Sequence, residues 1–155
     1  MAERTEAERQ ILYQHDVDIV NRQADGKIAK LKEDFAKVEA RHLASVEKER
    51  AKWGAWLVKK KVQIKADWDR ALAKVRPGNE RQIAIINERY DGLEDIAELD
   101  MEQRINSVIE TDMRALDDVE NAMKRKVDDV ENWRSRELAD EVRQLQTHRQ
   151  RQRRE

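Results

Sequence analysis

The chain has 155 residues, with 32 basic and 33 acidic side chains that give a formal net charge of −1. Charged residues make up 42% of the sequence and aromatic residues only 5%, a composition that excludes a thick globular core and is typical of long helices with a narrow apolar face. The sequence contains no cysteine, which excludes disulfides and thiolate metal sites.

The sequence shows no segment of a targeting or membrane-spanning type. Its first ten residues lack the apolar stretch of a secretory signal. The longest apolar run, residues 83–86, is far shorter than a membrane span. We therefore expect an intracellular protein, located in the cytoplasm and without a transmembrane segment.

A first long helix is predicted over residues 5–75. Thr5 and Glu8 form a capping-box pattern at its start. The apolar positions that follow recur at the spacings of three and four that mark one face of a helix. They include Tyr13, Val17, Val20, Ala24, Ile28, Leu31, Phe35, Val38, Val46, Trp53, Leu57, Ile64, Trp68 and Leu72.

Three glycines, Gly26, Gly54 and Gly92, lie inside the predicted helices. An isolated glycine inside a helix costs about 1 kcal/mol relative to alanine, which a long helix tolerates, so we favour continuous helices. The alternative is a break near Gly26, which would give a three-helix arrangement with a short first helix.

Residues 76–79 are predicted to form the turn between the two helices, because they hold the only proline and a glycine. Pro77 lacks a backbone N–H and keeps the preceding residue out of the helical region, and Gly78 can adopt the positive φ of a tight turn. Asn79 is a favourable N-cap, with Gln82 three residues later. The predicted fold class is therefore all-α: one long antiparallel helical hairpin, a two-helix coiled coil that forms a single unit over residues 1–155.

A second helix is predicted over residues 80–150, and it shows the same helical period as the first. Its apolar positions include Ile83, Ile86, Tyr90, Leu93, Ala97, Met101, Ile105, Val108, Leu116, Val119, Met123, Val127, Val130, Trp133, Leu138, Val142 and Leu145. Residues 146–155 contain no apolar side chain, so we expect them to fray as a basic tail.

Charge gives a second reason to pair the two helices. Residues 48–76 carry ten basic and three acidic side chains, net +7, whereas residues 79–107 carry three basic and eight acidic ones, net −5. A fold at the turn places these blocks side by side, and such charges select partner and orientation. Residues 1–24, net −2, and residues 131–155, net +2, match in the same way.

No catalytic or cofactor-binding pattern is present among the titratable residues. The histidines, His15, His42 and His148, are far apart, and no His-Glu-x-x-His, P-loop or dinucleotide-binding motif occurs. His42 falls in the predicted seam and faces residues 112–114 in a hairpin, so we expect a histidine–carboxylate contact there. We predict a protein without enzymatic activity, metal or cofactor.

Residues 53–68 hold three of the four tryptophans together with the basic cluster 59–61. We interpret this segment as core next to the turn, because the second helix offers a matching apolar and acidic face. The alternative is a basic amphipathic segment for a membrane surface or a partner helix.

Seven apolar residues do not fit a single seam, and we predict that they form an interface with a protein partner or another copy of the chain. They are Leu12, Ile19, Val58, Val62, Ile85, Ile96 and Leu99. Scattered apolar residues are common on protein surfaces, but some of these recur at helical spacing, which favours burial in an assembly.

The C-terminal tail carries the arginines Arg143, Arg149, Arg151, Arg153 and Arg154. Such a tail can dock on an acidic protein, a membrane surface or nucleic acid, or it can stay solvated and complement the helix dipole. No sequence-specific nucleic-acid recognition is expected.

The function expected from these patterns is non-enzymatic. The chain would act as a structural or scaffold coiled coil through protein–protein interaction, in a larger assembly of cytoskeletal or axonemal type or in a homo-oligomer. The alternative is a binding regulator that docks on an acidic protein, membrane or nucleic-acid surface through its basic segments.

Overall fold

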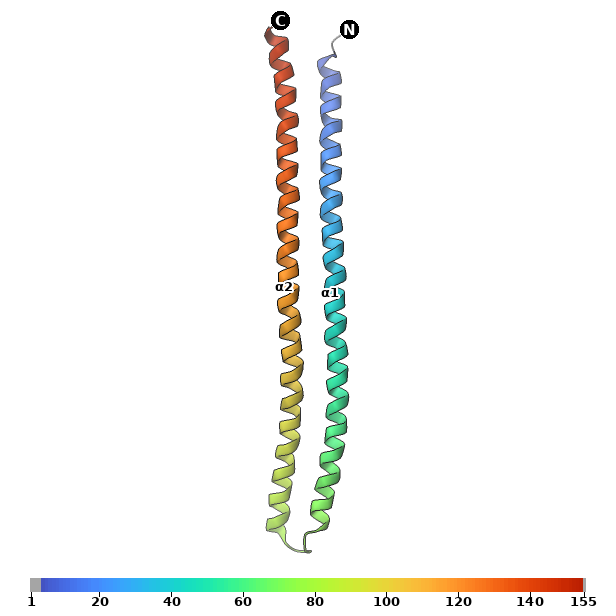
Figure 1. Cartoon of the computed structure of the whole chain (residues 1–155), viewed down its shortest axis with the longest axis vertical. Helices are drawn as coiled ribbons and strands as arrows, with labels where there is room; N and C mark the ends of the chain where they lie inside the picture. The colour runs from blue at the N-terminus through green and yellow to red at the C-terminus, as the bar shows by residue number, and fades with distance from the viewer. Residues whose placement is uncertain (1–3, 155) are drawn as a thin grey trace. The chain divides into compact units, whose positions relative to one another are not determined.

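A computed structural model of the chain describes residues 4–154. Helix α1 spans Glu6–Ala73 and helix α2 spans Glu80–Arg154. The two helices are joined by a short turn and run antiparallel (Figure 1). Within the described residues there is no strand, so the predicted all-α helical hairpin is confirmed.

Side-chain caps begin both helices as their sequence patterns predict. The Thr5 Oγ1 atom accepts a hydrogen bond from the Glu8 backbone N–H at 3.2 Å. Asn79 Oδ1 accepts one from the Gln82 N–H at 3.3 Å, and the Asn79 side-chain amide donates to Gln82 Oε1 at 3.1 Å. Each cap satisfies a backbone donor that the first turn of a helix leaves free.

The turn itself depends on Gly78, which has a φ of 89°. Before it, the N–H groups of Lys74 and Val75 bond three residues back, at 3.3 and 3.1 Å, which tightens the end of α1. For this reason α1 ends at Ala73, two residues before the predicted residue 75. At the other end α2 continues to Arg154, four residues beyond the predicted residue 150, so residues 146–154 of the tail that was expected to fray are helical, and residue 155 lies outside the described residues.

The interior glycines do not interrupt the helices. α1 continues through Gly26 and Gly54, and α2 continues through Gly92. The alternative three-helix arrangement with a break near Gly26 is therefore wrong. The cost of one interior glycine is about 1 kcal/mol, whereas a break would expose several backbone groups and end the packing of the apolar face.

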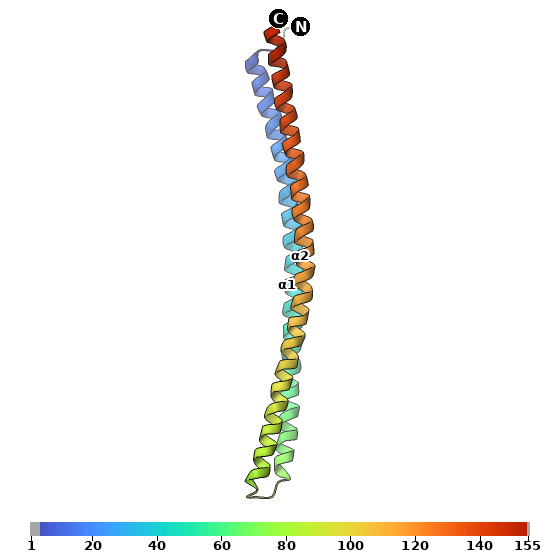
Figure 2. The ribbon, with the colours of Figure 1, turned by 90° about the vertical axis from the view of Figure 1, so that its left-hand side faces the viewer.

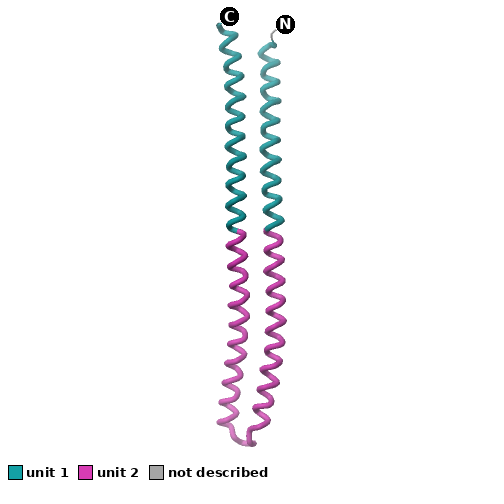
Figure 3. The backbone as a smooth tube through the Cα atoms, in the orientation of Figure 1, with its two compact units in different colours: residues 1–38, 117–155 teal, residues 39–116 magenta. Residues whose placement is uncertain are grey.

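The helix pair divides into two compact units (Figure 3). Unit 1 contains residues 1–38 and 117–155, and unit 2 contains residues 39–116 with the turn. In each unit a segment of α1 lies alongside a segment of α2 in both views of the ribbon (Figures 1 and 2). That residues 1–155 act as a single domain stays a prediction.

Each unit buries very little. Among residues 4–154 the buried apolar residues are Val20 and Ala24 in unit 1 and Ile64 and Ala97 in unit 2, each with 8% or less of its surface exposed. All four lie on the predicted seam, and most other seam residues are half-buried. A helix that packs against only one neighbour covers only one face, so the core is a single row of contacts.

Two glycine-to-alanine substitutions should change stability in opposite directions. Gly78→Ala forces a side chain into the left-handed region, so we expect the free energy of unfolding to fall by about 1–2 kcal/mol. Gly26 lies inside α1 with nothing within 4 Å of an added Cβ, so Gly26→Ala should raise the free energy of unfolding by about 1 kcal/mol. Urea unfolding monitored by circular dichroism measures both, and equal effects of the two substitutions would contradict the assigned turn.

Candidate functional site

The seven apolar residues predicted to form an interface are all exposed. The exposed fractions are Leu12 39%, Ile19 40%, Val58 64%, Val62 64%, Ile85 58%, Ile96 63% and Leu99 52%. Leu12 and Ile19 belong to unit 1, and the other five belong to unit 2. Their exposure is a property of the fold, whereas their binding to a partner stays a prediction.

Further exposed apolar residues were not predicted from the sequence. Ile11, Leu43 and Met113 are 69%, 57% and 58% exposed, and Val142, which the pattern placed in the seam, is 37% exposed. Leu93, which the pattern placed in the seam, is 39% exposed because it lies at the edge of the contact row. Met113 could have been found as the continuation, at spacings of three and four, of the outer face that carries Leu99.

In unit 2 the seam contains the histidine–carboxylate contact expected from the sequence. His42 Nδ1 lies 3.1 Å from Asp112 Oδ1, and the two side chains are 25% and 18% exposed. The second carboxylate oxygen, Oδ2, is buried and has no hydrogen-bond partner within residues 4–154. The pair therefore links the helices at one height, and breaking it would leave a desolvated carboxylate behind.

Two tryptophans of unit 2, Trp53 and Trp68, contact α2. Trp68 stacks on Tyr90 with ring centroids 5.8 Å apart, and its indole N–H donates to Asn87 Oδ1 at 2.9 Å. The Arg104 guanidinium lies 4.5 Å from the centre of the Trp53 ring, a cation–π contact between the helices. Through these contacts Trp53 and Trp68 pack in the seam near the turn, as predicted.

Ion pairs between the helices follow the charge match seen in the sequence. In unit 2, Lys61 donates to Glu98, and this hydrogen bond to a carboxylate raises the pKa of Lys61. In unit 1, Arg134 pairs with Asp25. The acids Glu98 and Asp25 are 50% and 69% exposed and the bases Lys61 and Arg134 are 39% and 21% exposed, so water still reaches each pair, and the pairs contribute to register and orientation more than to stability.

The basic tail is the last part of α2 and lies in unit 1. Arg149 bonds across to α1, with Nε 3.3 Å from Glu6 Oε1. Arg143 pairs with Asp140 on its own helix at 3.6 Å. Arg151, Arg153 and Arg154 form the last turn and are exposed. The tail is thus helical, and its cations complement the negative end of the helix dipole.

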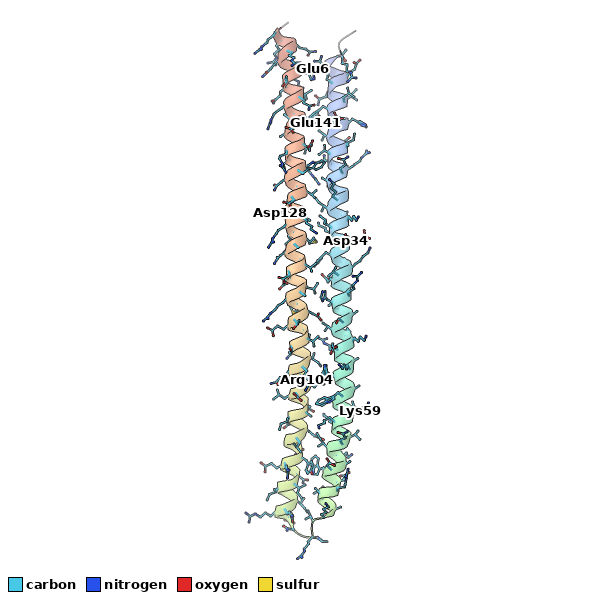
Figure 4. The ribbon with its side chains drawn as sticks, in the orientation of Figure 1. Glu6, Asp34, Lys59, Arg104, Asp128 and Glu141 are labelled. Atoms are coloured by element: carbon cyan, nitrogen blue, oxygen red, sulfur yellow. The ribbon has the colours of Figure 1, made fainter. Side chains whose placement is uncertain are left out.

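A groove near the chain ends of unit 1 contains Glu141, an acid whose pKa is raised. It is lined by Tyr13 and Asp16 of α1 and by Glu141, Leu145 and His148 of α2, with Glu141 on the side of α2 that faces α1 (Figure 4). Partial burial raises the pKa of Glu141, and the nearby Asp16 carboxylate raises it further. The groove thus places two acids together, and Arg4 and Arg9 also line it.

The described residues contain neither a cluster of metal-ligand side chains nor a helix that could cross a membrane. Residues 4–154 contain no cluster of three or more histidine or acidic side chains that could hold a metal ion. Neither helix, over the part that the structure describes, is long and apolar enough to cross a membrane. Comparisons of the chain with known protein families, with curated proteins and with solved structures gave no match.

A double-mutant cycle tests the histidine–carboxylate contact. His42→Leu leaves the Asp112 carboxylate half-buried without its partner, so we expect a loss of about 1–3 kcal/mol in the free energy of unfolding. Replacing both residues by leucine should recover most of this loss, since a matched apolar pair can substitute for a half-buried polar pair. Urea unfolding measures the four free energies, and additive effects of the two single substitutions would show that the side chains do not interact.

The pH dependence of stability tests the raised pKa of Glu141. A carboxyl group whose pKa is raised by folding favours the folded state at low pH and loses this effect as pH rises through the folded pKa. Glu141→Gln should therefore stabilise the protein at pH 7, and the gain should disappear as the pH falls below the usual range for a glutamate. Thermal unfolding at a series of pH values measures this; a gain of equal size at pH 3 would contradict the electrostatic cause.

Proposed function

We propose that the chain is a structural or scaffold protein that works through protein–protein contacts made by the outer faces of its helix pair. The observation that supports this is the set of large apolar residues in unit 2 that the fold leaves uncovered. Ile96 and Val58 are each more than 60% exposed, and each lies on a face of its helix that the seam does not cover. Apolar surface that recurs on one face of a helix favours burial against another helix.

The seam supports the same function in a second way. With four buried apolar residues within residues 4–154, the helix pair has a thin core, and further burial on its outer faces would add to its stability. A part of a larger assembly, of cytoskeletal or axonemal type or a homo-oligomer, fits both features. Such a part acts through shape and contact, which accords with the absence of a catalytic motif in the sequence.

A second candidate, a binding regulator, is supported by the basic end of α2. Arg151, Arg153 and Arg154 are exposed in its last turn. These cations could dock on an acidic protein surface, and the contact would weaken as salt concentration rises. Arg149 is already paired with Glu6, which leaves the last turn as the part of the tail that would carry this binding.

The native mass of the chain in cell extract tests both candidates. We expect the chain to sediment in a particle much heavier than 18.4 kDa. Ile96→Glu with Leu99→Glu should release it, because the substitutions place charges in an apolar contact. Helix content from circular dichroism of the purified variant checks that the fold is kept.

A matched variant separates the two candidates. Replacing Arg151, Arg153 and Arg154 by glutamine should leave the particle intact if the apolar faces make the contacts. Release by the arginine variant alone would favour the binding regulator. Sedimentation of the unchanged chain at its own mass in extract would overturn the scaffold function.

A further inference from the structure

Unit 2 carries a second apolar face on each helix, away from the seam. On α1 it consists of Ala51, Ala55, Val58 and Val62, which we call the α1 stripe, and all four residues are exposed. On α2 it consists of Ile85, Gly92, Ile96 and Leu99, which we call the α2 stripe, and its three large side chains are more than half exposed. In both stripes the residues are separated by three, four or seven positions, which is the spacing of a helix-packing face.

The two stripes lie on opposite sides of unit 2. A helix turns by roughly 100° per residue. Around the axis of α1, the α1 stripe is rotated by about 130° from the seam residues in the direction of increasing residue number. Around the axis of α2, the α2 stripe is rotated by about 140° from the seam residues in the opposite sense, that of decreasing residue number. Because the helices run antiparallel, opposite offsets along the chain point to opposite sides of the pair. One partner therefore cannot cover both stripes from a single side.

The stripes also lie at the same height along the helix pair. Height is fixed by the contacts across the seam, His42 with Asp112, Lys61 with Glu98 and Trp68 with Tyr90. Because the helices run antiparallel, the residue numbers of paired positions add to nearly the same sum, 154, 159 and 158 in these three contacts. By this sum, residue 58 lies at the height of residue 99, and residue 62 lies at the height of residue 96. Val58 is thus level with Leu99, and Val62 is level with Ile96.

The charged residues that interrupt the stripes match in the same way. Lys48 continues the α1 stripe toward its N-terminal end, and Glu110 continues the α2 stripe at the same height. At the other end, Asp69 continues the α1 stripe and Arg89 continues the α2 stripe at the same height, so the signs of the two charges are reversed. All four side chains are exposed. Lys59, at the edge of the α1 stripe, points away from α2 (Figure 4).

Gly92 adds an independent observation. An added Cβ at this position would meet nothing within 4 Å, so no contact inside the fold requires a glycine there, although a glycine inside a helix costs about 1 kcal/mol. It lies within the α2 stripe, at the height of Ala66 on α1. A small residue opposite a small residue allows two helices to approach closely.

We propose that a second copy of this chain docks beside the first, in the same direction and without axial offset, so that the α1 stripe of one copy packs on the α2 stripe of the next. This inference rests on the proposed scaffold function and names the partner. In this arrangement Val58 meets Leu99 of the neighbour and Val62 meets Ile96. Lys48 faces Glu110, and Asp69 faces Arg89.

Charge selects this pairing over the two symmetric ones. Residues 48–76 are net +7 and residues 79–107 are net −5. Two α1 stripes or two α2 stripes in contact would therefore set like charges together, whereas an α1 stripe against an α2 stripe brings opposite charges together. The contact uses different surfaces on the two copies, so each added copy leaves one stripe free, and association is open-ended.

Two complementary variants test the pairing in the purified full chain. Val58→Glu with Val62→Glu disables the α1 stripe, and Ile96→Glu with Leu99→Glu disables the α2 stripe. Each variant alone should associate roughly a hundredfold more weakly than the unchanged chain, since buried or opposed charges at the contact are costly. Leu43→Glu is the control. Leu43 is a large apolar residue of unit 2 that is about as exposed as the stripe residues, but it lies off both stripes.

Mixing the two variants gives the decisive result, measured by sedimentation equilibrium over a range of concentrations. Each variant keeps the stripe that the other has lost, so the mixture should form a 1:1 dimer that does not grow further. The unchanged chain should grow beyond a dimer as concentration rises. Self-association of either variant alone at the strength of the unchanged chain would overturn the proposal, as would a mixture that stays monomeric.

Engineered cysteines test the register, since the chain has no cysteine of its own. Ala44 lies one heptad before Ala51 on the outer face of α1, and it is level with Met113 on the outer face of α2. Ala44→Cys in one chain and Met113→Cys in another should form a mixed disulfide under mild oxidation. Ala44→Cys with Ile85→Cys, far apart in height, should not. Equal yields from the two pairs would overturn the proposed alignment.

The outcomes also separate this inference from the scaffold function. If the purified chain stays monomeric at every concentration while the native particle in extract persists and still depends on Ile96 and Leu99, the neighbour is a different protein. The second-copy inference then fails, and the scaffold function stands. If the particle is absent from extract and the purified chain is monomeric, both fail.

Discussion

The burial of one narrow apolar seam is the constraint on which this fold depends. With 42% charged residues, the chain has no means of building a layered core, so each helix must use the other as its only cover. A helix of this kind is stable in water chiefly through tertiary packing. The consequence is visible in the burial pattern, in which small residues such as Ala24 and Ala97 are the most completely enclosed. They allow the helices to approach, and larger neighbours close over them only partly.

Polar contacts across this seam fix the axial alignment of the two helices. His42 with Asp112, Lys61 with Glu98 and Asp25 with Arg134 contribute little net stability, because their groups remain partly in water. A sliding error of one turn would, however, separate several such pairs at once. The apolar row alone tolerates sliding, since one half-buried side chain resembles the next. Charge therefore gives specificity to a contact whose strength comes from burial.

Local features could be predicted from the sequence, and collective ones could not. The caps at Thr5 and Asn79 and the turn at Gly78 depend on a few adjacent residues, and the structure forms them with the expected hydrogen bonds. The exposure of Ile96 and Val58 followed from helical periodicity. The exposure of Leu93 did not, because a residue at the edge of the seam is covered or not according to small rotations of both helices. The continuation of α2 from the predicted residue 150 to Arg154 was also missed, since the pairing of Arg149 with Glu6 that holds this end is a contact between distant segments.

The single turn also has a consequence for the order of folding. Contacts across the seam close loops of very different size: Trp68 and Asn87 are 19 residues apart in the chain, His42 and Asp112 are 70 apart, and Gln10 and Arg149 are 139 apart. Closing a larger loop costs more entropy, so each pair forms most readily once the pair nearer the turn is in place. The two helices should therefore pair first next to Pro77 and then progressively toward the chain ends. During synthesis, the N-terminal end of the first helix can pair only after most of the second helix has been made.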